Sequence, residues 1–195
     1  MTNMKALLYC TNAKPYLSLV GKYDNGKNYY EAINDKTILD NALNGKVLAE
    51  CDYEVEEIKP EKYWHSTEDF DYIYNTGTVY YDDLLKKSCL MDYELDDYLG
   101  CEDKGYAIHI KNLHIFNEPM ELWQFYSRAV EIDTIYGSYW CCTTITKVQN
   151  MMYVQDENQD KQYALIPVHS KELCKILNGD KTIVVKKKVL KEMLK

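Results

Sequence analysis

The chain has 195 residues, of which 46% are hydrophobic and 28% are charged, and its net charge is −8. This composition is typical of a globular domain, and a chain of this length buries enough apolar surface to fold without a disulfide or metal. Long nucleic acids are disfavoured as ligands, because Lys and Arg bind most phosphates and the only arginine is Arg128.

Neither a membrane segment nor a cofactor is expected. No stretch approaches the ~20 apolar residues that a membrane-spanning helix needs, and the first residues contain no long apolar leader run. The seven cysteines are odd in number and irregularly spaced, which predicts reduced thiols in a cytoplasmic protein. Cys141 and Cys142 are adjacent and form no CxxC pair, so no metal site is predicted.

Apolar runs predict strands, and leucines at helical spacing predict helices. In the first part of the chain we expect a strand at 5–10, followed by a polar excursion at 11–45 with a hairpin near 24–26. A second strand at 46–51 can extend to 58, and two helical pieces at 84–99 end at Gly100. Further on we expect either a strand pair or one long strand with a kink near Asn112 at 106–116, a short helix at 120–126 and a turn near Gly137. In the last part we expect a strand at 163–168, a helix at 171–177 with Ser170 as N-cap and Asn178–Gly179 as its end, a strand at 181–186 and a basic helix at 189–194.

The nineteen tyrosines leave two interpretations open. Tyrosine suits base-stacking pockets and protein interfaces, but a half-buried pleated surface is the preferred interpretation, because the tyrosines are spread along the chain without a pattern. The acidic segments 52–57 and 68–71 show no spacing typical of a catalytic carboxylate pair and are interpreted as solvated surface.

The C-terminal stretch ALIPVHSKELCKILNGDKTIVVKKKV contains a strand, a helix ending at Asn178–Gly179, and then Lys181–Thr182. This order resembles the opening of ASCH-domain proteins, which are relatives of the PUA fold. Earlier runs resemble later strands of that family; they are MKALLYCTNAKPYL, NGKVLAECDYEVEEI, GYAIHIKNLHIFNEPMEL and NMMYV. The sequence is similar to phage-encoded members. The resemblance implies an α+β fold, a PUA-like mixed β-barrel with flanking helices.

The order of these segments predicts a circular permutation. A single domain would span 1–195, with a main body at 1–155, a polar linker at 156–161 and a strand–helix–strand unit at 162–195 that completes the barrel. Domain termini lie at the surface, so a permuted order is physically accessible. The alternative is that the last unit inserts into a second copy and makes a swapped homodimer.

The resemblance also implies a ligand-binding cleft. Some ASCH members are amidohydrolases that act on acetylated cytidine, with a Gly-x-Lys-Thr-x-Thr-x-Arg motif and a distant glutamate. The lysine of this motif falls on Lys181, the second threonine on Val184 and the arginine on Lys186, while Thr182 is retained and the glutamate falls on the strand that contains Glu50. Valine cannot act as a nucleophile, so no catalytic residue is predicted.

The N-terminal run contributes three further candidates, Tyr9 as a stacking ring, Thr11, and Lys14 as a partner for a phosphate. Lys14 is equally interpretable as a loop charge, and Lys181 as a solvated lysine after a turn. The preferred function is a non-catalytic module that binds a nucleoside, nucleotide or modified base. The alternatives are a phage accessory or counter-defence protein that binds a host protein through an acidic, Tyr-rich surface, and an amidohydrolase with rearranged residues.

Overall fold

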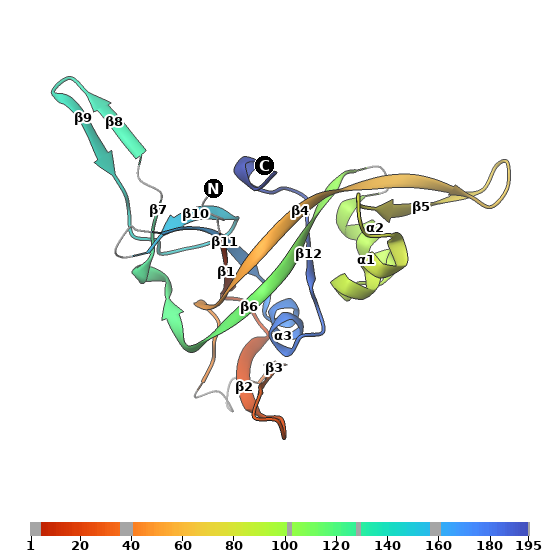
Figure 1. The fold of residues 1–195 in the computed structure, drawn as a ribbon, viewed down its shortest axis with the longest axis horizontal. Coiled ribbons are helices and arrows are strands. Elements are labelled where there is room, and N and C mark those ends of the chain that lie inside the picture. Colours follow the sequence, from red (N-terminus) through yellow and green to blue (C-terminus); the bar gives the residue numbers. More distant parts are fainter. Residues whose placement is uncertain (1–4, 36–40, 101–102, 128–129, 157–160, 195) are drawn as a thin grey trace. The chain divides into compact units, whose positions relative to one another are not determined.

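The computed structural model describes residues 5–35, 41–100, 103–127, 130–156 and 161–194 (Figure 1). The described residues form an α+β fold that is rich in strands. They fold into two compact units, Met1–Asp52 with Asn112–Asn178, and Tyr53–Lys111 with Gly179–Lys195. The segment 162–195 is therefore divided between the units, with its first strand and helix in the first and its last strand in the second.

Two long strands have residues in both units, β4 (Lys46–Trp64) and β6 (Gly105–Glu121). The remaining elements of the first unit are β1 (Lys5–Cys10), β2 (Tyr16–Lys22), β3 (Asn28–Ile33), the 3-10 helix η2 (Leu122–Gln124), β7 (Tyr126–Ser127), β8 (Val130–Thr134), β9 (Gly137–Cys141), β10 (Met152–Gln155), β11 (Gln162–Val168) and α3 (Ser170–Asn178). Those of the second unit are β5 (Phe70–Asn75), α1 (Tyr81–Ser88), α2 (Asp92–Leu99), β12 (Ile183–Lys186) and the 3-10 helix η3 (Lys191–Leu194).

In the first unit the strand order is β4-β1-β11-β10-β7. β1 pairs with β11 in parallel and with β4 in antiparallel, and β10 pairs with β11 in antiparallel. In the second unit the order is β12-β6-β4, with β5 also paired to β4. No closed ring of strands is found in the part of the chain that the structure describes, so closure into a barrel stays a prediction.

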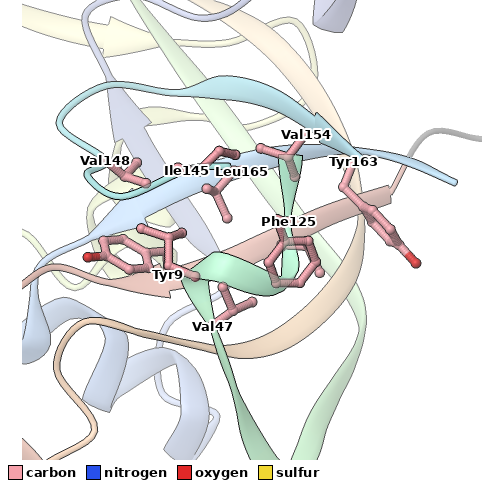
Figure 2. Close-up of a cluster of buried hydrophobic side chains, with 10 residues drawn as sticks. Tyr9, Val47, Phe125, Ile145, Val148, Val154, Tyr163 and Leu165 are labelled. Atoms are coloured by element: carbon pink, nitrogen blue, oxygen red, sulfur yellow. The ribbon is translucent and has the colours of Figure 1, made fainter. Parts of the chain in front are cut away.

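β1 is buried on both faces, which explains its continuous apolar sequence. Leu7 and Tyr9 lie two residues apart and enter the same hydrophobic cluster, together with Tyr163 and Leu165 of β11 (Figure 2). The other members of this cluster are Val47, Leu122, Phe125, Ile145, Val148 and Val154. Separately, α3 buries Leu173, Ile176 and Leu177 at helical spacing.

The end of α3 is fixed to β3 by Asn178. Its side-chain oxygen accepts from the backbone N–H of Tyr30 at 3.0 Å, and its Nδ2 donates to the backbone oxygen of Tyr30 at 2.9 Å. The side-chain amide thus pairs with Tyr30 as a neighbouring strand would. Gly179 follows with a φ of 90°, a conformation that favours glycine and ends the helix as predicted.

The second unit has a core of its own around α1, α2 and the sheet, built from Ile58, Tyr74, Val79, Leu84, Leu95, Leu99, Ala107, Ile183 and Val185. Gly105 begins β6 against this core. A Cβ atom at this position would lie 2.5 Å from Cδ2 of Leu99, so only glycine fits without a shift. Gly100 ends α2 with a φ of 84°, as the sequence predicts.

Several elements confirm their predictions, among them the strand at 5–10, the hairpin around 24–26, the paired helices and the long strand with an irregularity at Asn112, whose φ is 49°. The predicted short helix at 120–126 is wrong beyond the single turn of η2. Met120 and Glu121 instead continue β6. The predicted basic helix at 189–194 is only the turn of η3, and the strand predicted at 181–186 begins at Ile183.

The expected linker at 156–161 joins neighbouring antiparallel strands. Residues 157–160 lie outside the described residues, but Asp156 donates its backbone N–H to the oxygen of Lys161 at 3.4 Å. β10 and β11 pair on either side of it. The segment therefore connects two strands of one sheet. β11 pairs in parallel with β1, so the C-terminal segment lies beside the N-terminal strand in this sheet.

Candidate functional site

The carboxyl ends of β1 and β11 lie side by side because the two strands are parallel. Cys10 is opposite Val168, and Thr11 donates its backbone N–H to the oxygen of Val168 at 3.0 Å. The chain then leaves β1 through the loop 11–15 and leaves β11 into α3. In open sheets, ligands bind beyond the carboxyl ends of parallel strands, where helix N-termini attract anions. We refer to this region as the strand-end site.

The loop 11–15 is held in one conformation by Asn44. Its Nδ2 donates to the backbone oxygens of Thr11 at 3.2 Å, Ala13 at 2.7 Å and Pro15 at 3.2 Å. Its Oδ1 accepts from the backbone N–H of Leu17 at 2.7 Å. One side chain thus contacts three backbone oxygens of a loop that has no regular structure and one backbone N–H of β2, which preorganises the loop.

The start of α3 provides a second anchor for the same loop. The hydroxyl of Ser170 donates to the oxygen of Pro15 at 2.6 Å, and Nε2 of His169 lies 3.1 Å from the oxygen of Lys14. The backbone N–H of Lys171 points to Nδ1 of His169 at 3.4 Å. This pattern assigns the hydrogen of the neutral imidazole to Nε2, because a carbonyl oxygen can only accept. Ser170 is the first residue of α3 and is not the helix N-cap that the sequence predicts, because the carbonyl of His169 before it accepts the first helical hydrogen bond, from Leu173.

The groups presented at the strand-end site are suited to an anion. The side chains of Lys14, His169 and Lys171 are exposed. The hydroxyl oxygen of Thr11 is buried and has no hydrogen-bond partner among the described residues. A lysine beside a helix N-terminus combines a full charge with the partial positive charge of the helix dipole, and a hydroxyl adds a donor. Groups of this kind, a cation and a hydroxyl near a helix N-terminus, are chemically suited to a phosphate or a carboxylate.

Two other predicted residues of the first unit lie elsewhere in it. Tyr9 is only 5% exposed and lies in the hydrophobic cluster (Figure 2), so its ring offers no free face for stacking. Burial raises the pKa of Tyr9, which keeps its hydroxyl neutral. Glu50 of β4 accepts from the ammonium of Lys5 at 2.9 Å. This hydrogen bond raises the pKa of Lys5, and it gives Glu50 a structural partner.

The three C-terminal candidates belong to the second unit. Lys181 is 4% exposed, and its ammonium donates to the backbone oxygen of Ser88 at 2.6 Å. The interpretation of Lys181 as a solvated lysine is therefore wrong, since it is a buried group with a backbone partner. Thr182 is exposed, and its backbone bonds to Lys87 and Ile110. Lys186 ends β12 and is partly buried.

The motif position occupied by Val184 is buried in β12. A buried aliphatic side chain offers no group for general acid, general base or nucleophilic chemistry. The ammonium of Lys181 is thus held by a backbone oxygen of the second unit, and position 184 lacks the reactive hydroxyl that the resemblance would require.

A polar cluster that the sequence does not predict lies around Glu56 of β4. Thr76 and Thr78 donate their hydroxyls to its two carboxylate oxygens at 2.5 and 2.7 Å. Nε2 of His109 lies 3.3 Å from one of these oxygens. Burial raises the pKa of Glu56, but the two hydrogen bonds and His109 outweigh it, so the pKa of this carboxyl is lowered overall. The acidic segment 52–57 is thus not solvated surface throughout.

Neither a metal-binding group of side chains nor a membrane-spanning helix is found in the described part of the chain. No group of three or more His, Cys, Asp or Glu side chains could hold a metal ion among these residues. Among the same residues, no helix has the length and apolar character needed to cross a membrane. Cys10 and Cys51 carry free thiols in the strands, and burial raises the pKa of each to about 12, so neither is a reactive thiolate.

Comparison with known proteins adds no further assignment. No protein family model, no curated protein and no solved structure matches the chain. The resemblance to ASCH-domain proteins therefore rests on the sequence motifs alone.

Proposed function

We propose that the protein is a non-catalytic binding module for a small phosphorylated ligand of the nucleotide class, held at the strand-end site. The observation that carries this proposal is the loop 11–15, which Asn44 and Ser170 fix beside the start of α3 while the Lys14 side chain stays exposed. Such preorganisation reduces the conformational entropy lost on binding, which favours a specific small ligand.

The nucleotide class is proposed from the family resemblance together with the site. Thr11 and Lys14 belong to the run that resembles the ASCH strand leading to a Lys-Pro pair. The proposal includes a PUA-like barrel in circularly permuted order. The parallel pairing of β11 with β1 supports it, because the C-terminal segment then completes the sheet of the N-terminal strand.

We base the proposed absence of catalysis on two residues of the second unit. Val184 is buried where the amidohydrolase motif has its reactive threonine, and the ammonium of Lys181 bonds to a backbone oxygen. A deacetylation of acetylated cytidine would need a nucleophile or an activated water at this motif. Neither side chain is suited to provide one.

The test is a thermal-shift screen of the full chain against mononucleotides, the matching nucleosides, inorganic phosphate and N4-acetylcytidine. A ligand that binds only the folded state adds about 2.7 kcal/mol of stability at a hundredfold excess over its Kd. We expect nucleotides to raise Tm and nucleosides to do so weakly, since the phosphate supplies the charge that Lys14 and α3 attract.

The matched variants are Lys14→Ala and Lys147→Ala. Both lysines are exposed residues of the first unit, and only Lys14 belongs to the strand-end site. Lys14→Ala should weaken nucleotide binding by roughly tenfold, as loss of one charge-assisted contact does, while Lys147→Ala should leave it unchanged. Equal binding by both variants, or release of acetate from N4-acetylcytidine, would overturn the proposal.

A further inference from the structure

The β8–β9 hairpin exposes an unusual concentration of large apolar side chains. It contains five of the sixteen large hydrophobic residues that are exposed in the described part of the chain, namely Ile132, Ile135, Tyr136, Tyr139 and Trp140. Ile135 is 91% exposed, Tyr136 94% and Trp140 69%. Single exposed apolar residues are ordinary, but a contiguous group on one element indicates an interaction surface.

The register of the hairpin separates its side chains into two faces. Ile132 lies opposite Tyr139, and residues opposite one another in an antiparallel pair share a face, so this face is apolar. Glu131 lies opposite Trp140, and Asp133 opposite Ser138, so the other face combines an indole ring with two carboxylates.

The tip of the hairpin has a defined conformation. The hydroxyl of Thr134 donates to the backbone oxygen of Gly137 at 2.7 Å and accepts from the backbone N–H of Tyr136 at 3.2 Å. Gly137 has a φ of 119°, which strongly favours glycine. Ile135 and Tyr136 are therefore presented at a fixed turn, and a partner gains their burial without ordering the loop first.

The hairpin lacks the support that strand pairs usually have. β8 and β9 pair only with each other among the described residues, and every residue from 131 to 140 is exposed. A two-stranded hairpin is at best marginally stable in water unless one of its faces is covered. Tyr and Trp are also the residues that most often dominate the binding energy of protein interfaces.

The negative charge of the hairpin indicates which class of partner it can bind. Residues 130–141 contain Glu131 and Asp133 and no Lys, Arg or His. These carboxylates repel the phosphates of nucleic acids and of anionic lipids. A second copy of the chain would bring the same two carboxylates and a net charge of −8 to the interface.

We propose that the β8–β9 hairpin docks into an apolar groove of a protein partner whose rim carries Lys or Arg. Ile135 and Tyr136 enter the groove at the tip, Ile132 and Tyr139 cover one wall, and the two carboxylates face the basic rim. This surface is independent of the strand-end site, since it shares no residue with that site.

The probe for this proposal is a displayed library of random linear and cyclic peptides, selected on the full chain and depleted on a Tyr136→Ala/Trp140→Ala variant. We expect the surviving peptides to combine aliphatic or aromatic residues with Lys or Arg. Their binding should weaken at least tenfold on Tyr136→Ala and should be unchanged on Trp123→Ala, which removes an exposed indole outside the hairpin. It should also weaken several-fold in about 0.5 M salt, where surface charges are screened.

Charge reversal separates the electrostatic part of the proposal from the apolar part. Glu131→Lys/Asp133→Lys should weaken basic peptides and leave the melting temperature unchanged, because both side chains are exposed. Selection of peptides without Lys or Arg, or of peptides that bind Tyr136→Ala as well as the wild type, would overturn the proposal. So would self-association of the wild type, or binding to anionic vesicles or single-stranded RNA, if Tyr136→Ala abolishes it.

Discussion

The hydroxyl of Ser170 donates to the backbone oxygen of Pro15 at 2.6 Å, across 155 positions of the sequence. Ser170 is fully buried, so this hydrogen bond is shielded from water. It fastens the first turn of α3 to the loop that follows β1. The same contact joins the N-terminal strand to the C-terminal segment of the first unit.

Ser170→Ala should destabilise the protein by about 0.5–1.5 kcal/mol, because the oxygen of Pro15 loses its short buried donor and keeps only the contact with Asn44 at 3.2 Å. Urea unfolding of the variant and the wild type measures this difference. Ser66→Ala is the control, because Ser66 is exposed, and its free energy of unfolding should match that of the wild type. A Ser170→Ala variant as stable as the control would show that this contact contributes nothing.

Asn44→Asp tests whether the loop 11–15 depends on the amide group. Aspartate keeps the oxygen that accepts from Leu17 but loses the Nδ2 donor to the loop. We expect faster hydrogen exchange in the loop and a loss of about 2–3 kcal/mol, because several backbone oxygens then face a carboxylate. Nucleotide affinity should fall with it. Unchanged exchange rates would contradict the role assigned to Asn44.

Lys181→Met distinguishes a structural lysine from a ligand contact. The variant keeps much of the side-chain volume but leaves the oxygen of Ser88 without its ammonium donor. We expect a lower Tm, with a cost of about 1–3 kcal/mol, and unchanged affinity for a nucleotide at temperatures where the variant is folded. Calorimetric titration measures the nucleotide affinity of the variant. A loss of affinity without a loss of Tm would show that Lys181 contacts the ligand instead.

Glu56 should make the stability of the second unit depend on pH. Its pKa in the folded state is below the ordinary value of 4.5, so its contribution is present above that value and is lost as the pH falls through the folded-state pKa. The carboxylate is partly solvated, so the effect should be no more than about 1 kcal/mol. Urea unfolding between neutral pH and about pH 3 should show a smaller acid loss for Glu56→Gln than for the wild type. Glu54→Gln, which removes an exposed carboxylate of the same strand, serves as the control.

Gly105→Ala should destabilise the second unit by about 1–3 kcal/mol, because the new methyl overlaps the buried Leu99 side chain. Thermal unfolding measures the effect. Gly77→Ala is the matched control, since nothing lies within 4 Å of the methyl that it would add. Combining Gly105→Ala with Leu99→Val should recover part of the loss if steric overlap is the cause.

The sequence alone determined the local elements whose patterns are long enough to be read. The apolar run at 5–10 predicts β1, and the leucine spacing with Gly100 predicts α1 and α2. The sequence also predicts Thr11 and Lys14 as ligand-binding candidates. The structure places both in the loop 11–15, and their binding role stays a prediction. Periodicity and turn chemistry are local properties, so they survive without knowledge of the fold.

Only the tertiary structure decided which polar side chains are paired and which stay exposed. Lys181 meets Ser88 across 93 positions, Asn44 reaches back to Ala13 across 31, and Glu56 receives its hydroxyls from positions 76 and 78. No local pattern encodes such contacts, because they depend on the register of distant strands and on where loops end. Burial is likewise set by neighbours far apart in sequence. For this reason Lys181, which the sequence also allows as a surface charge, is a buried donor in the fold. The exposure of the β8–β9 hairpin is visible only in the fold for the same reason.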